Sequence, residues 1–191
     1  MTRWEPNASG RLQRAALELY SERGYDQTTV AEIAKRAGLT ERTFFRYFAD
    51  KREVFFYGSQ ILQDRLVQGI DDAPDGQPPL AVVGAALEVA AAPFEEAGDF
   101  PRRRQAIIAA NPELQERELI KLAALAAALA DALRRRNVPD PAASLAAEAG
   151  IAVFKIAFLR WAGQTGDSGG QTLAQLIRQS LAELKTVAAG S

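Results

Sequence analysis

The stretch TTVAEIAKRAGLTERTFFRYFADK, residues 28–51, determines how the N-terminal part of this chain folds. Thr29 and Glu32 have the spacing of a capping box, in which the threonine hydroxyl accepts from the Glu32 amide and the carboxylate accepts from the Thr29 amide. A helix is therefore predicted to begin at Val30, and its apolar residues recur at helical spacing. Gly38 tolerates a positive φ and is predicted to end this helix.

A second short helix is predicted to follow, with Thr40 as its N-cap. Phe44 and Phe48 are four residues apart, share one face and are predicted to enter the core. Hydroxyls, aromatic rings and cations crowd this helix and its flanks, and these groups suit contact with phosphates and base edges. Two short helices joined by a tight turn, with such residues on the second, favour a DNA-binding helix-turn-helix. The predicted DNA-binding residues are Thr29, Thr40, Arg42, Thr43, Phe45, Tyr47 and Lys51.

The alternative interpretation of this segment is an ordinary helical hairpin in a small bundle. A hairpin of that kind would present polar residues to solvent, but it would have no reason to concentrate the side chains that contact nucleic acids. The concentration around Arg42 and Tyr47 therefore favours DNA binding.

Residues 11–57 resemble the N-terminal domain of TetR-type transcriptional regulators. The matching positions are Ala15-Ala16, Leu19-Tyr20, Gly24-Tyr25, Thr28-Thr29-Val30, Ile33-Ala34, Ala37-Gly38, Thr43-Phe44-Phe45-Arg46-Tyr47-Phe48 and Lys51. The resemblance implies a homodimeric, usually ligand-responsive DNA-binding repressor. The family more often has tyrosine where this chain has Phe45, so one expected phosphate contact is lost. The ring can still stack on the sugar-phosphate backbone or meet a thymine methyl.

The composition narrows the function further. The 191 residues include no Cys and no His, which removes disulfides, thiol chemistry, Cys/His zinc sites and histidine bases. An oxygen-ligand metal site stays formally open, but no Asp/Glu set has a spacing that demands one. We therefore expect no enzyme activity, no catalytic residues, no metal and no cofactor.

Charge and hydropathy favour a two-part soluble protein. Residues 1–52 hold ten Lys/Arg and seven Asp/Glu, for a charge of +3, whereas residues 53–191 carry −4. The N-terminal residues have no apolar core typical of a signal peptide. The longest apolar run, residues 151–161, is interrupted by Lys155 and Arg160, and it is too short to span a bilayer. A cytoplasmic protein with no membrane partner is predicted.

Helix formers dominate the whole chain, and no alternating strand pattern persists. The sequence predicts an all-α protein of about nine helices, with a DNA-binding domain over residues 1–52 and a ligand-binding and dimerisation domain over residues 53–191. The expected helices are 9–23, the two short helices above, 51–69 after the cap Asp50, 80–97, one following Pro101, 112–136, 141–163 and 171–188.

The helix predicted over residues 141–163 is apolar nearly all round, so every side of it must be covered. A central core helix within one chain would satisfy this need. The resemblance favours a second interpretation, because TetR-type regulators dimerise through their last two long helices. The residues predicted for a dimer contact are Phe154, Leu173, Ile177 and Leu181.

The body of a TetR-type protein usually holds a cavity, and the resemblance therefore implies a small-molecule effector. The segment from Arg102 through ANPELQERE, together with the helix predicted over residues 141–163, also resembles a C-terminal domain of some regulators of this family, including mycofactocin-type ones. This resemblance implies an apolar, acyl-type effector, and the expected partner is a small apolar or amphipathic molecule. The alternative is a solid core with no cavity. The predicted ligand-binding residues are Phe94, Arg103, Arg104, Ile107, Ile108, Lys155, Phe158 and Trp161.

The leading hypothesis is a ligand-responsive repressor that binds a palindromic operator as a dimer. The alternatives are an all-α small-molecule carrier and a protein-binding scaffold, either of which would retain the helix-turn-helix head without using it.

Overall fold

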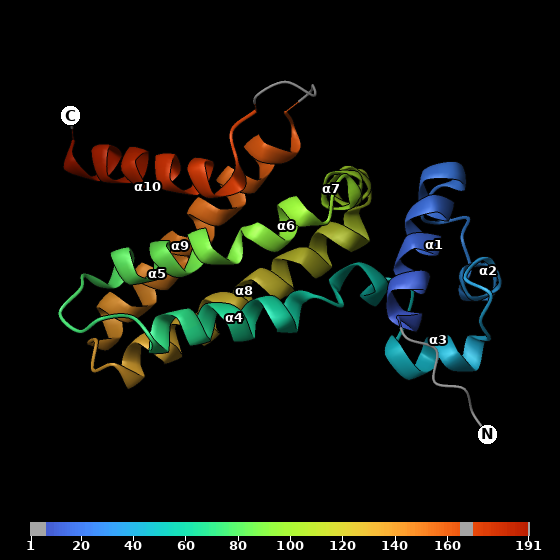
Figure 1. The fold of residues 1–191 in the computed structure, drawn as a ribbon, viewed down its shortest axis with the longest axis horizontal. Helices are drawn as coiled ribbons and strands as arrows, with labels where there is room; N and C mark the ends of the chain where they lie inside the picture. Colours follow the sequence, from blue (N-terminus) through green and yellow to red (C-terminus); the bar gives the residue numbers. More distant parts are fainter. Residues whose placement is uncertain (1–6, 165–169, 191) are drawn as a thin grey trace. The chain divides into compact units, whose positions relative to one another are not determined.

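The computed structural model describes residues 7–164 and 170–190. Within these ranges the chain forms ten α-helices and one 3-10 helix, and no strand, in agreement with the predicted all-α fold (Figure 1). Contacts divide the chain into two compact units, which are described separately. The first comprises Met1–Gly58 and Arg103–Glu118, and the second comprises Ser59–Arg102 and Leu119–Ser191.

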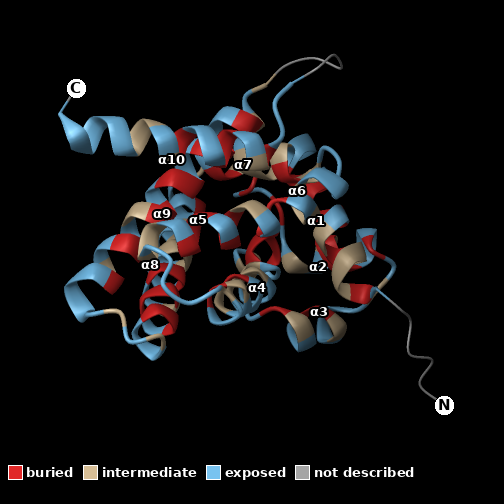
Figure 2. Cartoon of the chain, turned by 60° about the vertical axis from the view of Figure 1, so that its left-hand side comes forward, coloured by how far each residue is buried: buried red, intermediate tan, exposed pale blue. Residues whose placement is uncertain are grey.

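The first unit is built around an apolar core on the inner faces of its short helices. Leu12, Leu19, Ile33 and Phe44 are almost completely buried there. Buried stretches of α1, α2 and α3 are red in Figure 2. The predicted core positions Phe44 and Phe48 are therefore confirmed. The unit contains α1 (Ala8–Arg23), α2 (Val30–Arg36), α3 (Glu41–Tyr47), η1 (Glu53–Phe56), most of α7 (Phe100–Ala110) and the start of α8 (Pro112–Arg135).

The turn between α2 and α3 depends on a glycine. Gly38 has φ +66°, a left-handed conformation that side-chain-bearing residues adopt at a cost. A Cβ at this position would lie 2.8 Å from Nη2 of Arg11. That guanidinium donates to the carbonyl of Ala37 at 2.5 Å, so α1 holds the turn in place.

The predicted helix over residues 51–69 is wrong as a single element. Asp50 does cap the segment, because its Oδ1 accepts from the amides of Arg52 and Glu53. The result is the short helix η1, and α4 (Ser59–Asp71) begins only after Gly58. Glycine costs about 1 kcal/mol in a helix interior, and the break at Gly58 coincides with the boundary between the units.

The predicted helix over residues 80–97 is also divided. It forms α5 (Pro79–Ala90) and α6 (Ala92–Glu96). Pro93 explains the break, because proline has no amide hydrogen and its ring clashes with the carbonyl four residues earlier in a continuous helix.

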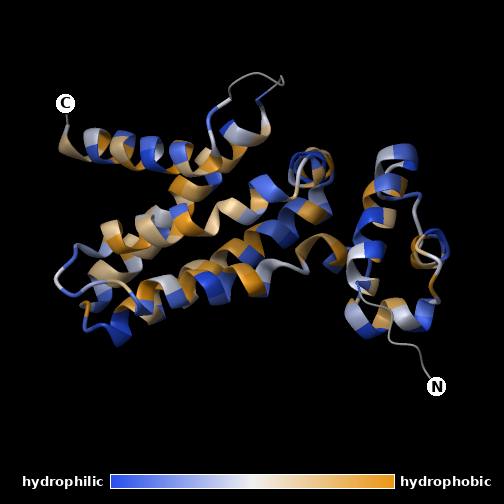
Figure 3. Ribbon diagram, viewed as in Figure 1, coloured by the Kyte–Doolittle hydropathy of each residue, from blue (hydrophilic) through white to orange (hydrophobic). Residues whose placement is uncertain are grey.

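The second unit packs around α9 (Asp140–Ala162), which lies against α5 and α10 (Leu173–Ala189). Apolar residues run along these helices (Figure 3). Gly150 allows α9 and α5 to approach closely, since a Cβ there would lie 2.3 Å from Cγ1 of Val83. The core of this unit is therefore largely made of Ala, Leu and Val side chains from neighbouring helices.

Among the described helices, α9 alone is long and apolar enough to cross a membrane by composition. Half of its most apolar stretch is buried inside the unit. A central helix of a globular core has the same properties, so this helix gives only weak evidence for a membrane segment.

Candidate nucleic-acid interface

Helices α2 and α3 both begin at the predicted threonine caps. Thr29 accepts from the Glu32 amide, and Glu32 accepts from both the amide and the hydroxyl of Thr29. These hydrogen bonds hold the pKa of Glu32 below its usual value. The lowered pKa means that the cap is complete at neutral pH and is lost only as the pH falls through it. Thr29 thus caps helix α2, and its predicted contact with DNA stays a prediction.

Thr40 has the same role for α3. Its Oγ1 accepts from the Thr43 amide at 3.2 Å and lies 3.1 Å from the Thr43 hydroxyl. The two hydroxyls therefore form a pair at the start of the helix. Thr40 is exposed and Thr43 is half-buried, so both can still reach a ligand from this end.

The exposed face of α3 carries two cations and an aromatic ring. Arg42 is exposed and has no hydrogen-bond or ion-pair partner among the described residues. Phe45 is 55% exposed, although Phe44 beside it is fully buried. Arg46 lies over the Tyr47 ring, 5.0 Å from its centroid, and its Nη2 donates to the Tyr47 hydroxyl. This face can contact both anionic and apolar groups.

Sequence reasoning missed Arg46 as a member of this surface. It lies one helical turn after Arg42, and that spacing places the two guanidinium groups on the same side of the helix. The spacing of four residues between Arg42 and Arg46 is the sequence signal that predicts a shared helix face. Arg46 also orients Tyr47, which is half-buried.

Lys51 has a different environment from the one expected for a phosphate contact. Its ammonium donates to the carbonyls of Tyr25 at 2.9 Å and Thr28 at 3.2 Å, and it lies 4.2 Å from the centre of the Tyr25 ring. These contacts fix the loop between α1 and α2. A phosphate would compete with them for the ammonium hydrogens, so a DNA contact by Lys51 stays a prediction.

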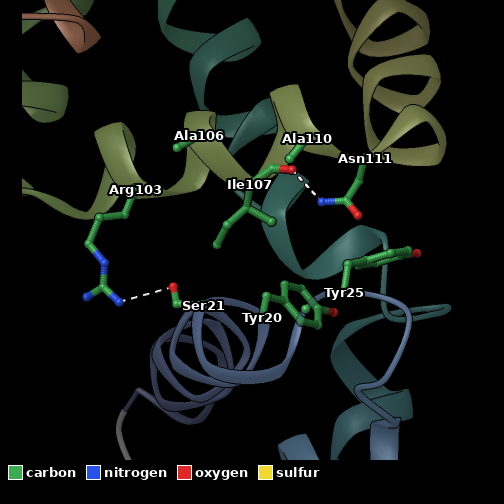
Figure 4. Close-up of a pocket in the computed structure, with 9 residues that line it drawn as sticks. Tyr20, Ser21, Tyr25, Arg103, Ala106, Ile107, Ala110 and Asn111 are labelled. Atoms are coloured by element: carbon green, nitrogen blue, oxygen red, sulfur yellow. Dashed lines mark hydrogen bonds between the residues drawn. The ribbon is translucent and has the colours of Figure 1, made fainter.

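The predicted ligand-binding residues fall in both units. In the first, Arg103 and Ile107 line an open hollow of about 430 Å³ with Tyr20 and Tyr25 (Figure 4). Arg103 donates to the Ser21 hydroxyl at 3.2 Å (Figure 4). Ile108 is fully buried in the same unit.

Arg104, also in the first unit, already has internal partners. Its Nε donates to the Phe55 carbonyl at 2.7 Å, and its guanidinium lies 5.0 Å from the centre of the Phe56 ring. Burial lowers the pKa of Arg104 to about 10, partly offset by the Glu118 carboxylate. Arg104 therefore stays cationic at neutral pH, and its charge is used inside the unit.

The other predicted ligand-binding residues lie in the second unit. Phe94, Phe154, Phe158 and Trp161 form a continuous aromatic cluster, with neighbouring ring centres 5.5–5.9 Å apart. The Arg102 guanidinium lies over the Trp161 ring at 4.4 Å, a cation–π contact that the sequence had not indicated. Lys155, on α9, is exposed, whereas Phe154, Phe158 and Trp161 on the same helix are buried. An effector site that uses all the predicted residues together stays a prediction.

Three of the residues predicted for a dimer contact lie inside their own chain. Phe154 is 7% exposed, and Leu173 and Ile177 are fully buried in the core of the second unit. Leu181 is partly buried and packs beside that core. These side chains interact within one chain because α9 packs its most apolar face against α5 and α10. The exposed large apolar residues of α9 are instead Leu145, Ile156 and Leu159.

Metal ligands are not gathered at any point in the described part of the chain. Neither residues 7–164 nor residues 170–190 contain a cluster of three His, Cys, Asp or Glu side chains that could hold an ion.

Comparison with known proteins connects this geometry to a family. Residues 12–57 match the family model described as bacterial regulatory proteins, tetR family. The chain is 34% identical over 97 residues to the HTH-type transcriptional regulator TcmR of Streptomyces glaucescens, covering 45% of this chain and 43% of that protein. It is 30% identical over 129 residues to the putative mycofactocin biosynthesis transcriptional regulator MftR of Mycobacterium tuberculosis, covering 66% and 64%.

The fold is also similar to that of a solved regulator. The structure of Thermus thermophilus FadR, a TetR-family transcriptional repressor in complex with lauroyl-CoA, superposes with a TM-score of 0.52. It is 26% identical, and 93% of each chain is covered. These relatives are named as transcriptional regulators rather than enzymes. The matched segments span less than two thirds of the two curated relatives, whereas the match to the family model lies on α1–α3 and η1. Residues 12–57 therefore match the DNA-binding domain of the tetR family of bacterial regulatory proteins, and the chain is similar to bacterial transcriptional regulators in sequence and in its all-α fold.

Proposed function

We propose that this protein is a DNA-binding transcriptional regulator whose helix α3 enters the major groove. The exposed face of α3 carries the proposal, because it presents Arg42, Phe45 and Arg46 from a rigid, doubly capped helix pair. In helix-turn-helix proteins the second helix contacts base edges, and the first crosses the backbone. DNA binding is assigned to residues 1–52, and effector binding and dimerisation to residues 53–191. Contact with chromosomal DNA would place the protein in the cytoplasm.

A dimer is part of the proposal. Leu145 is 72% exposed, Ile156 48% and Leu159 46%, and all three lie along one stripe of α9 together with the exposed Ala152. Apolar side chains at this helical spacing pack well against a second helix. Two copies related by a two-fold axis would present two α3 helices, so the proposed operator is palindromic.

We further propose that the regulator is a repressor controlled by an apolar or amphipathic effector. The FadR structure with lauroyl-CoA supports this class of effector, and the aromatic cluster around Phe158 offers apolar surface in the second unit. The protein would have one conformation that binds the operator and one that does not. An effector can release DNA only if it binds the second conformation more tightly than the first.

Replacing Arg42 tests the proposed DNA interface. A bidentate arginine–guanine contact contributes roughly 1–3 kcal/mol of discrimination, so Arg42→Ala should lose preference at one base pair of each half-site. Binding-site selection from random duplexes, applied to both proteins, measures this change. Arg65→Ala removes an exposed arginine of α4 and should keep the wild-type consensus.

The same experiment separates the alternatives. If Arg42→Ala keeps the consensus but its salt slope falls by about 0.9, Arg42 contacts a phosphate instead. A wild-type protein that retains no duplex would contradict the regulator proposal and favour the carrier or the protein-binding scaffold.

Trp161 gives a direct measurement of effector binding. The sequence has two tryptophans, so Trp4→Phe leaves Trp161 as the only one. Its ring is 3% exposed and contacts Phe158 and Arg102. A fatty acid or acyl thioester that enters the cluster should change its fluorescence and release operator DNA. In the Trp161→Phe variant the remaining Trp4 should give no such change. A broad panel that alters neither fluorescence nor operator affinity would contradict the effector proposal.

A further inference from the structure

Phe45 has an environment that a purely structural residue would not have. Its side chain is 55% exposed, although it is a large apolar ring on a seven-residue helix. The ring meets Phe44 edge-on, with centroids 5.5 Å apart and planes at 81°. Phe44 is fully buried, so it provides a fixed base against which the Phe45 ring rests. The ring is therefore held outward from the core.

The chemistry of phenylalanine limits what this ring can recognise. A phenyl ring has no hydroxyl and cannot donate a hydrogen bond to a phosphate. In the major groove, most of the base edges offer hydrogen-bond donors and acceptors, and the 5-methyl group of thymine is the apolar feature. If α3 lies in that groove, the thymine methyl is the group that an outward phenyl ring fits best.

The neighbouring cation strengthens this assignment. Arg42 precedes Phe45 by three residues, so the two side chains lie on the same side of α3. An α-helix rises about 1.5 Å per residue, which separates them by about 4.5 Å along the axis. That distance is close to the ~3.4 Å rise between bases of one DNA strand. Arg42 and Phe45 can thus meet the same or adjacent base pairs.

We propose that Phe45 is a specificity-determining residue that recognises a thymine methyl next to the base pair contacted by Arg42. This inference rests on the proposed DNA-binding function. It adds a base-specific apolar contact to the polar and charged contacts expected from Arg42 and Arg46.

The test removes single methyl groups from DNA. In a selected operator, each thymine in turn is replaced by deoxyuridine, which pairs identically but lacks the 5-methyl group. A buried methyl contributes about fourfold to affinity, so one position per half-site should weaken wild-type binding by about fourfold. Replacement in both half-sites should weaken it by roughly 15-fold. In Phe45→Ala the same replacements should have almost no effect.

Two further variants make the result specific. Arg65→Ala removes an exposed arginine of α4, outside the proposed interface, and should keep the wild-type pattern of thymine sensitivity. Phe45→Leu keeps an apolar side chain and should retain part of the effect. The inference is overturned if no thymine-to-deoxyuridine replacement weakens wild-type binding. It is also overturned if the replacement that weakens wild-type binding weakens Phe45→Ala binding equally. Tight operator binding with either of those results would leave the proposed function intact, whereas absence of any bound duplex would remove both.

Discussion

Ile156→Glu is expected to convert the proposed dimer into a monomer and to weaken operator binding by about 10² or more. The side chain is 48% exposed on the apolar stripe of α9, so a glutamate there is solvated in the free chain. In a dimer the same carboxylate would be buried without a partner, which typically costs several kcal/mol. Two linked binding modules gain about 10²–10⁴ in affinity over one, and a monomer would forfeit that gain.

Native mass spectrometry and operator binding at micromolar concentration measure the two effects together. Val89→Glu is the matched control, since Val89 is 80% exposed on α5, outside the α9 stripe, and it should leave both properties unchanged. The monomeric variant should keep the helical circular dichroism spectrum of the wild type, because the side chain at position 156 is 48% exposed within one chain and its replacement leaves the core unchanged. A wild-type protein that is already monomeric would contradict the dimer proposal.

This substitution also shows where sequence and structure differ. An apolar helix such as α9 is compatible with burial in one chain or between two, and the pattern alone gives no way to assign each face. The structure assigns Phe154 to the inner face, with Leu173 and Ile177 of α10 in the same core. A charge at Ile177 would therefore disrupt the core of one chain. A charge at Ile156 would instead be placed on the exposed stripe of α9, where it tests the proposed dimer contact.

The N-terminal part was predictable to a much greater extent. Its signals are local: the Thr29–Glu32 capping box, the positive-φ glycine at position 38 and the four-residue spacing of Phe44 and Phe48. Contacts between distant segments were less predictable. Lys51 meets the carbonyls of the α1–α2 loop, and Arg104 meets the carbonyl of Phe55. No spacing rule indicates such pairs, because they depend on how separate helices pack.

Helix divisions show the same dependence on context. Pro93 gave a local reason to end a helix, and the chain does break there. Gly58 was a weaker signal, because helices tolerate an isolated glycine at a cost of about 1 kcal/mol. The burial of Val54, Phe55 and Phe56 in the first unit fixes the short helix η1 before that glycine.

The second large effect is expected from Phe44→Ala. This ring is completely buried in the first unit and contacts the rings of Phe45 and Phe48. Truncating a buried phenylalanine typically costs about 3–5 kcal/mol, because both the transfer free energy and the packing of the surrounding residues are lost. That is a large part of the ~5–15 kcal/mol by which a domain is stable. The helix-turn-helix part of the first unit should therefore be largely destabilised, and operator binding should be lost with it.

Phe45→Ala is the matched control, because it removes the same ring from the next residue. The Phe45 side chain is mostly in solvent, so its loss should cost about 1 kcal/mol or less, chiefly the edge-on contact with Phe44. Hydrogen exchange of the α2 and α3 amides measures the local stability of the helix-turn-helix in each of the two variants. Protection should collapse in Phe44→Ala and persist in Phe45→Ala, even though both variants bind the operator less well. Equal loss of protection would mean that Phe45 supports the fold, and the same result would remove the basis for its contact with thymine.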